Sequence, residues 1–327
     1  MLLAHFYRPW PAHLVLALLA IASCLCTPAF AASGSDGKIV FTSDRTGSWQ
    51  IYTMNPDGSD VFQVTNLPPT DDDEIFATLS PDGKQIAFNY QGGDGLDIYI
   101  VNTDGTGLRQ ITTDHVSLLP NWRPDGKRIA FTQASEFGTG VIAVMTPDGK
   151  VVNHLTSSDW DSGGPIYTHD GKHIVFGSEM GGYVSAVWIM NSDGSHQQRL
   201  TRAAMRGAPN SISPDNRTIL LTDNRDSPPA LPNSLYRMNI DGTGLKKLAG
   251  LRQFHHDLGP SYSPDGGRIS FSSDRFSDDI TPWTYGTFSI FVVNADGTDI
   301  NEIFSSAGSC PFDGNCVGTS WGAGADQ

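Results

Sequence analysis

A short apolar run returns along the chain at intervals of roughly 43 to 50 residues. The six copies are residues 39–41, 86–88, 129–131, 174–176, 219–221 and 269–271. These runs lack strict alternation of apolar and polar positions, which is typical of strands buried on both faces. A repeat of this length indicates the blades of a β-propeller.

Three further strand-like segments and two kinds of turn accompany each apolar run. A second run leads in most copies into an Asn-x-Asp-Gly turn, as at residues 102–105 and 294–297. After a third run, a fourth segment ends in a Ser-Pro-Asp-Gly-type turn, as at residues 80–83 and 263–266. Proline fixes the first corner of such a turn, aspartate bonds to the local backbone, and glycine accepts positive φ. Four strands per copy predict an all-β fold, a six-bladed β-propeller of four-stranded blades.

The two ends of the repeat region complement each other. The first copy lacks its innermost strand, and residues 319–323 have the missing pattern, because they align with residues 120–122 and 260–262. We therefore predict that the C-terminal strand pairs with the N-terminal strands and removes an open sheet edge. The expected propeller domain covers residues 38–324.

The composition supports this fold and excludes some classes of binding partner. The chain of 327 residues has 39% hydrophobic residues, 35 Gly and 20 Pro, which suits many short strands and turns. Its formal net charge of −14 argues against nucleic acid or an anionic membrane as a partner. A basic protein surface, a cation or a neutral ligand remains open, and we expect a monomer.

The first residues have the features of a targeting segment. Arg8 provides a basic n-region, residues 14–22 form a short apolar stretch, and residues 29–31 offer an A-x-A cleavage site. We predict a signal peptide at residues 1–31 and a periplasmic or secreted protein without a transmembrane span, since the apolar stretch is short. An alternative is a bacterial lipoprotein box at residues 21–24, which would anchor the protein through a lipidated Cys24.

After cleavage the mature chain keeps Cys310 and Cys316, six positions apart in the sequence. In an oxidising compartment we expect them to form a disulfide that closes one loop. Two thiolates without a nearby His or Cys make half a zinc site, so we expect no metal there. No cofactor is expected elsewhere.

The recurring Ser-Pro-Asp-Gly-Lys, Ile-Ala-Phe and Ile-Tyr-x-x-Asn-x-Asp-Gly pattern resembles the WD40-like propeller repeats of the TolB family. The resemblance covers roughly residues 38–324. It implies a six-bladed propeller that binds a protein or another ligand in the bacterial envelope. The chain departs from full-length TolB because it has no room for the α/β domain that precedes the propeller there. Propellers of prolyl-oligopeptidase-type peptidases and of oligogalacturonate lyases are similar too.

Topology predicts where binding residues lie. In a four-stranded meander, the Pro-Asp-Gly and Asn-x-Asp-Gly turns share one face, which we call the turn face. The blade-to-blade loops and the loops between first and second runs share the opposite face, the variable face, where length and chemistry differ between copies. The candidate binding residues lie in these loops, and the last of them comes from the insertion at residues 274–285. They are Asp71, Asp72, Asp73, Glu74, Asp114, His115, Asp159, Trp160, Asp161, Arg206, His255, His256, Asp257 and Trp283.

Acidic groups in most of these loops would concentrate negative potential at the mouth of the central channel and attract a cation, an amine or a basic peptide. Ordinary solvated loops are the alternative. We expect a binding module, and the sequence identifies no catalytic residue. An alternative function is a metal-dependent polysaccharide lyase of the oligogalacturonate type, which would need His115 and His255 to converge on the channel. A third is the propeller of a peptidase.

Overall fold

The computed structural model describes residues 36–69, 75–93, 95–135, 139–180, 185–201, 208–223, 233–248, 256–275, 288–304 and 316–324. All of them belong to one compact unit, Ala32–Gln327. The predicted signal peptide at residues 1–31, with Cys24, lies outside the described residues. Within the described ranges, no helix has the length and apolar character needed to cross a membrane.

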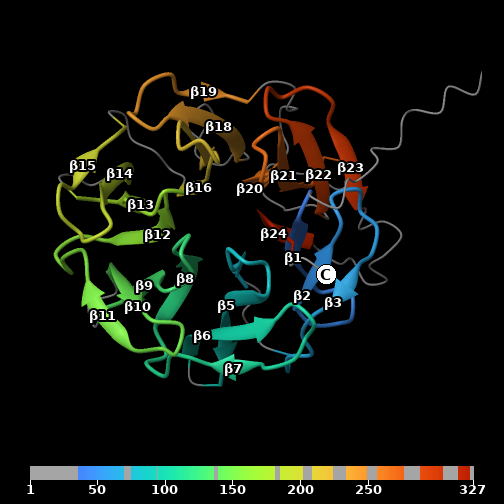
Figure 1. The fold of residues 1–327 in the computed structure, drawn as a ribbon, viewed down its shortest axis with the longest axis horizontal. Helices are drawn as coiled ribbons and strands as arrows, with labels where there is room; N and C mark the ends of the chain where they lie inside the picture. Colours follow the sequence, from blue (N-terminus) through green and yellow to red (C-terminus); the bar gives the residue numbers. More distant parts are fainter. Residues whose placement is uncertain are drawn as a thin grey trace, which may run out of the picture. The chain divides into compact units, whose positions relative to one another are not determined.

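The described residues form six antiparallel sheets of four strands, which we name blades A to F (Figure 1). Blade A contains β24 (Cys316–Gly322), β1 (Lys38–Ser43), β2 (Gln50–Met54) and β3 (Phe62–Gln63). Blade B contains β4 (Ala77–Leu79), β5 (Gln85–Gly92), β6 (Gly95–Asn102) and β7 (Arg109–Gln110). Blade C contains β8 (Ser117–Trp122), β9 (Ile129–Ala134), β10 (Gly140–Met145) and β11 (Val151–His154).

The remaining three blades repeat the same strand order. Blade D contains β12 (Ser162–Tyr167), β13 (His173–Ser178), β14 (Ala186–Asn191) and β15 (Gln198–Arg199). Blade E contains β16 (Ala208–Ile212), β17 (Thr218–Asp223), β18 (Ser234–Asn239) and β19 (Lys246–Lys247). Blade F contains β20 (Asp257–Tyr262), β21 (Arg268–Ser273), β22 (Ser289–Asn294) and β23 (Asn301–Phe304). The predicted six-bladed, all-β propeller is confirmed.

Ring closure also follows the prediction. Strand β24 pairs antiparallel with β1, and the register sets Trp321 opposite Ile39 and Gly322 opposite Lys38. Blade A is thus built from the last strand and the first three strands of the propeller.

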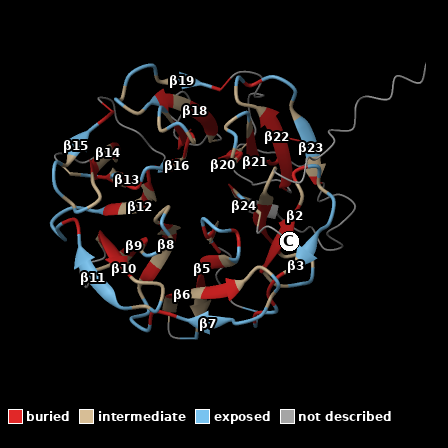
Figure 2. Cartoon of the chain, viewed as in Figure 1, coloured by how far each residue is buried: buried red, intermediate tan, exposed pale blue. Residues whose placement is uncertain are grey.

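The core lies between neighbouring blades. The third residue of the repeated apolar run is fully buried in all six blades; it is Leu221 in blade E and a phenylalanine in the other five, Phe41, Phe88, Phe131, Phe176 and Phe271. Complete burial of a side chain of this size contributes about 1.5–3 kcal/mol. The second and third strands of each blade are mostly buried, whereas outer strands such as β7 and β11 face solvent (Figure 2). This explains why the strong apolar runs mark the middle strands of the blades.

The two turn types share one face, as predicted. In blade B the backbone N–H of Thr103, from the Asn-x-Asp-Gly turn, donates to the carbonyl of Lys84 in the Pro-Asp-Gly turn at 2.9 Å. Blade D has the equivalent bond from Ser192 N–H to the Lys172 carbonyl at 2.8 Å. The blade-to-blade loops therefore lie at the opposite ends of the strands.

Candidate functional site

The structure describes half of the candidate binding residues. Asp114, His115, Asp159, Trp160, Asp161, His256 and Asp257 are described, whereas Asp71, Asp72, Asp73, Glu74, Arg206, His255 and Trp283 lie outside the described residues. Cys316 begins β24, but Cys310 is outside the described ranges, so the disulfide stays a prediction. The predicted convergence of His115 and His255 on the channel stays a prediction too, because His255 lies outside the described ranges.

The described loops do share the variable face. The N–H of Leu96, at the start of the third strand of blade B, donates to the His115 carbonyl at 3.2 Å. In blade D, the N–H of Glu179 donates to the Asp161 carbonyl at 2.9 Å. Each bond joins a blade-to-blade loop to the end of the hairpin formed by the second and third strands of a blade, as the predicted sorting of loops requires.

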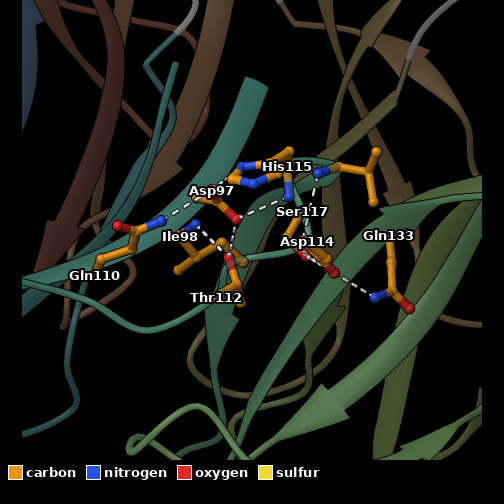
Figure 3. Close-up of polar contacts among 9 residues, drawn as sticks. Asp97, Ile98, Gln110, Thr112, Asp114, His115, Ser117 and Gln133 are labelled. Carbon is orange, nitrogen blue, oxygen red and sulfur yellow. Dashed lines mark hydrogen bonds and ion pairs between the residues drawn. The ribbon is translucent and has the colours of Figure 1, made fainter. Parts of the chain in front are cut away.

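His115 is held by a buried carboxylate that sequence reasoning did not single out (Figure 3). Asp97 on β6 is 2% exposed, and its Oδ1 accepts hydrogen bonds from Thr112 Oγ1 at 2.9 Å and from the His115 N–H at 3.1 Å. Its Oδ2 accepts from Gln110 Nε2 at 3.0 Å and lies 2.9 Å from His115 Nδ1. Because a carboxylate only accepts, this contact assigns the proton of the ring to Nδ1.

The backbone around His115 is equally constrained. His115 has a φ of 64°, in the left-handed region that few side-chain-bearing residues adopt. Gly95 lies against it, and a Cβ at Gly95 would come within 2.4 Å of the His115 carbonyl oxygen. The imidazole nevertheless remains 44% exposed. With Nδ1–H held by Asp97, the Nε2 atom is left as an acceptor, a base or a metal ligand.

Asp114, next in the same loop, anchors a second polar network. Its Oδ1 accepts from Ser117 Oγ at 2.8 Å, and its Oδ2 accepts from Gln133 Nε2 on β9. Gln133 Oε1 in turn lies 2.8 Å from His154 Nε2 on β11. The network thus crosses blade C from its innermost to its outermost strand.

The loop between blades C and D carries an exposed aromatic residue between two carboxylates. Trp160 is 42% exposed, and Asp159 and Asp161 are exposed too. Asp161 Oδ1 accepts from the N–H of Gly140, the first residue of β10, at 2.7 Å. Asp114 and Asp161 therefore bind the facing ends of β9 and β10, so the two loops flank one hairpin of blade C. We call His115, Asp114, Asp159, Trp160 and Asp161 the blade C site.

Asp257 lies inside blade F rather than on its surface. Its side chain is fully buried, and Oδ1 accepts from Arg275 Nη2 at 2.8 Å. Burial raises the pKa of Asp257, and the neighbouring guanidinium opposes that shift. Arg275 also stacks on Phe271 and Phe291, at 4.9 Å and 4.6 Å from the ring centres. This arrangement holds the start of β20 and offers no exposed carboxylate.

The described part of the chain contains no cluster of metal ligands. No group of three or more His, Cys, Asp or Glu side chains there is arranged to hold an ion. Sequence reasoning missed Asp97, Gln133 and His154. The signal for Asp97 was a charged residue within an otherwise apolar run at residues 96–101, whereas Gln133 and His154 carry no such mark.

Comparison with known proteins agrees with the fold. The TolB beta propeller domain family matches residues 74–233. An uncharacterized protein of Agrobacterium fabrum is 27% identical over 199 residues, 59% of this chain and 67% of that protein. A TolB homolog of Chlorobium luteolum is 30% identical over 139 residues, 42% of this chain but only 31% of that protein. The chain therefore spans about a third of the TolB homolog that it matches.

The solved structure of TolB from Acinetobacter baumannii superposes with a TM-score of 0.67 at 21% identity. The match covers 88% of this chain and 67% of that one, and at this identity it shows the fold alone. The superposition agrees with the propeller fold described above. The chain carries a β-propeller domain of the TolB type.

Proposed function

We propose that this propeller is an exported binding module of the bacterial envelope and that it holds a basic partner, a protein segment or a cationic small ligand, at the blade C site. The observation that carries the proposal is the half-exposed imidazole of His115, fixed in position by buried Asp97. A side chain that is fixed before binding loses less conformational freedom when a ligand arrives.

The chemistry of the site supports a basic partner. Asp114, Asp159 and Asp161 supply three carboxylates on an exposed surface, and Trp160 supplies an exposed ring. An indole face attracts ammonium and guanidinium groups, and aromatic residues dominate binding energy at many protein interfaces. The formal net charge of −14 would also speed the approach of a basic partner.

Capture from an envelope extract tests this proposal. Immobilised wild-type protein is compared with Asp159→Lys plus Trp160→Ala, and with Glu302→Lys as a matched charge control on the outer strand β23. Partners captured by the wild type and by Glu302→Lys but lost from the double variant support the blade C site. Equal capture by all three proteins, with the variants folded by circular dichroism, contradicts it.

A second candidate function is a metal-dependent polysaccharide lyase, which the Asp97–His115 pair favours. A histidine that ligates a metal commonly donates its other ring N–H to a carboxylate, as His115 does here. The test is incubation with polygalacturonate and Mn²⁺, with ultraviolet absorbance of the unsaturated product as readout. Product formation that is lost in His115→Ala supports the lyase, and absence of product in the wild type removes it.

A further inference from the structure

A cavity of about 310 Å³ opens on the turn face, between the Pro-Asp-Gly turns of blades B and C. We call it the turn cavity, and it is lined by Ser80, Pro81, Asp82, Gln85, Trp122, Pro124, Asp125 and Gly126. Trp122 is only 6% exposed, yet its indole Nε1 has no hydrogen-bond partner among the described residues. A buried N–H without an acceptor costs free energy that an incoming acceptor would recover.

The same position between blades F and A is occupied by the chain itself. Trp321 is the counterpart of Trp122, because each lies opposite the first residue of the adjacent apolar run, Ile39 and Ile129 respectively. The Trp321 Nε1 donates to the backbone carbonyl of Asp36 at 2.7 Å. The segment before β1 therefore supplies the acceptor that Trp122 lacks.

A charged pair completes that occupied position. Arg268 Nη2 donates to Asp36 Oδ2 at 3.0 Å, and the guanidinium lies 5.0 Å from the Trp321 ring centre. The next residue, Gly37, passes so close to the Gly322 carbonyl oxygen that a Cβ there would approach it to 2.0 Å. That Cβ would also lie 3.1 Å from the ring of Pro264, in the turn of blade F. The segment thus fits between the turn of one blade and the innermost strand of the next.

The neighbouring position between blades E and F is satisfied in another way. Tyr262 is the counterpart of Trp122 in blade F, since it lies opposite Ile269. Its hydroxyl forms a hydrogen bond with Thr218 Oγ1 of blade E at 2.9 Å. Among the described residues, Trp122 has neither a segment of chain nor a side chain of the preceding blade as acceptor, unlike its counterparts at these two junctions.

We propose that the turn cavity binds an extended peptide segment of another protein, with a peptide carbonyl accepting from Trp122 Nε1 and a Lys or Arg side chain pairing with Asp82 and Asp125. This is a second binding surface, on the face opposite the blade C site. The turn cavity differs from the occupied position in the charge that it prefers, because Gln85 of blade B takes the place of Arg268 of blade F. The two residues correspond because Gln85 lies opposite Asn102 and Arg268 lies opposite Asn294. The charged residues of the described lining are two carboxylates, of which Asp125 also lies 3.5 Å from Arg123 Nη1 at the edge of the cavity.

The walls suit a peptide of this kind. Pro81, Pro124 and the indole of Trp122 provide apolar contact for the backbone and for the aliphatic part of a lysine or arginine. Donation from the Ser80 hydroxyl lowers the pKa of Asp82, so its carboxylate is charged at neutral pH. Gln85 is held by Asn102, through Nε2 and Oδ1 at 3.3 Å.

Titration of ¹⁵N-labelled protein with acetyl-Gly-Gly-Lys-Gly-Gly-amide tests the proposal, with the Glu peptide of the same length for comparison. The indole N–H signal of Trp122 is assigned by its loss in Trp122→Phe. We expect this signal to shift saturably with the Lys peptide, while the signals of Trp188 and Trp321 stay in place. Affinity for the Lys peptide falls about fivefold in Asp82→Asn plus Asp125→Asn. The readout is local to Trp122, so it is independent of binding at the blade C site.

A gain-of-function variant gives the second arm. Gln85→Arg recreates the charge of Arg268 and should make the cavity bind an acetylated, amidated peptide of residues 34–39, Gly-Ser-Asp-Gly-Lys-Ile, which the wild type binds more weakly. The absence of any saturable Trp122 shift with the Lys peptide overturns the proposal. An equal response to the Lys and Glu peptides, or no gain with Gln85→Arg, overturns the assigned charge preference.

Discussion

The hydroxyl oxygen of Ser261 accepts a hydrogen bond from the backbone N–H of Trp321 at 3.0 Å, across the junction at which the ring closes. Equivalent bonds join neighbouring innermost strands elsewhere. Tyr167 N–H donates to Asn121 Oδ1 at 3.0 Å, Tyr262 N–H to Ser211 Oγ at 3.1 Å, and Leu79 N–H to Ser320 Oγ at 3.4 Å. Side-chain-to-backbone bonds between described residues thus join the innermost strands at four of the six junctions between blades.

We predict that Ser261→Ala lowers the free energy of unfolding by about 1–2 kcal/mol, because it leaves the Trp321 N–H without its acceptor. Urea unfolding measures the loss, and hydrogen exchange of the Trp321 amide should accelerate. Ser211→Ala is the matched control at a junction away from the closure, with a similar loss of stability and no effect on Trp321. An unchanged Trp321 exchange rate in Ser261→Ala would show that the bond does not hold the closing strand.

Leu119 marks a strained bulge in blade C. Its φ is 54°, while Gly164, Gly259 and Gly318 take similar values at the corresponding bulges of other innermost strands. A left-handed conformation costs a side-chain-bearing residue roughly 1–2 kcal/mol. Replacement by glycine removes this cost. It also raises the conformational entropy of the unfolded chain, which opposes folding by about 0.4–1 kcal/mol. We predict that Leu119→Gly raises the unfolding free energy by up to about 1 kcal/mol.

Gly259→Ala is the matched reversal of that substitution. It forces a side chain into φ 54° and brings a Cβ within 3.3 Å of Gly318 Cα, so the unfolding free energy should fall. Urea denaturation of both variants gives the comparison. A loss of stability in Leu119→Gly together with a gain in Gly259→Ala would refute the assignment of strain.

The aspartates of the turns should make the free energy of unfolding depend on pH. Their aspartates have pKa values below the ordinary 3.8, chiefly because a nearby Ser or Thr hydroxyl donates to each carboxylate; they are Asp57, Asp82, Asp104, Asp148, Asp170, Asp193, Asp215, Asp241, Asp265 and Asp296. The unfolded chain therefore binds protons more readily than the folded one. The stabilisation is fully present above pH 3.8 and is lost as the pH falls through the lowered values.

We expect the unfolding free energy to decline as the pH falls below about 4, through the lowered pKa values of these aspartates. Ser80→Ala and Ser263→Ala, which remove the hydroxyls that donate to Asp82 and Asp265, should make this decline shallower. Urea unfolding at a series of pH values measures the slope. A slope that is the same in the wild type and in the double variant would mean that these hydrogen bonds do not control acid stability.

At the candidate site, Asp97→Asn should disturb His115 more than any surface substitution. An amide offers one acceptor where the carboxylate serves four donors, so we predict a loss of about 2–3 kcal/mol in unfolding free energy. In the wild type, ¹⁵N chemical shifts of the ring should report the proton on Nδ1. The variant should show a mixture of tautomers, and a wild-type spectrum dominated by Nε2–H would contradict the Asp97–His115 contact.

The repeat made the architecture accessible from sequence. Apolar runs at a fixed spacing and the turn residues between them define strands, and the pattern of residues 319–323 identified the closing strand because it repeats residues 120–122. The sorting of loops followed from topology without knowledge of any side chain. These features depend on local sequence, so they can be predicted.

The contacts of the sites depend on positions that the pattern does not join. Asp97 and His115 are 18 residues apart, separated by the rest of β6 and the short outer strand β7, and meet only in the folded blade. The acceptor for Trp321 is Asp36, 285 residues away, so nothing local distinguishes Trp321 from Trp122. The bulge at Leu119 could not be predicted from the sequence, because the corresponding bulges have glycine, at Gly164, Gly259 and Gly318, whereas this one has leucine.

The central claim is that the variable face at blade C is the working surface. Hydrogen exchange of the protein alone and in complex with the partner purified by capture tests it most directly. The account predicts slower exchange at residues 113–118 and 157–162 in the complex, with no change in the outer strand β23. Protection confined to other blades, with these two segments unchanged, would contradict it.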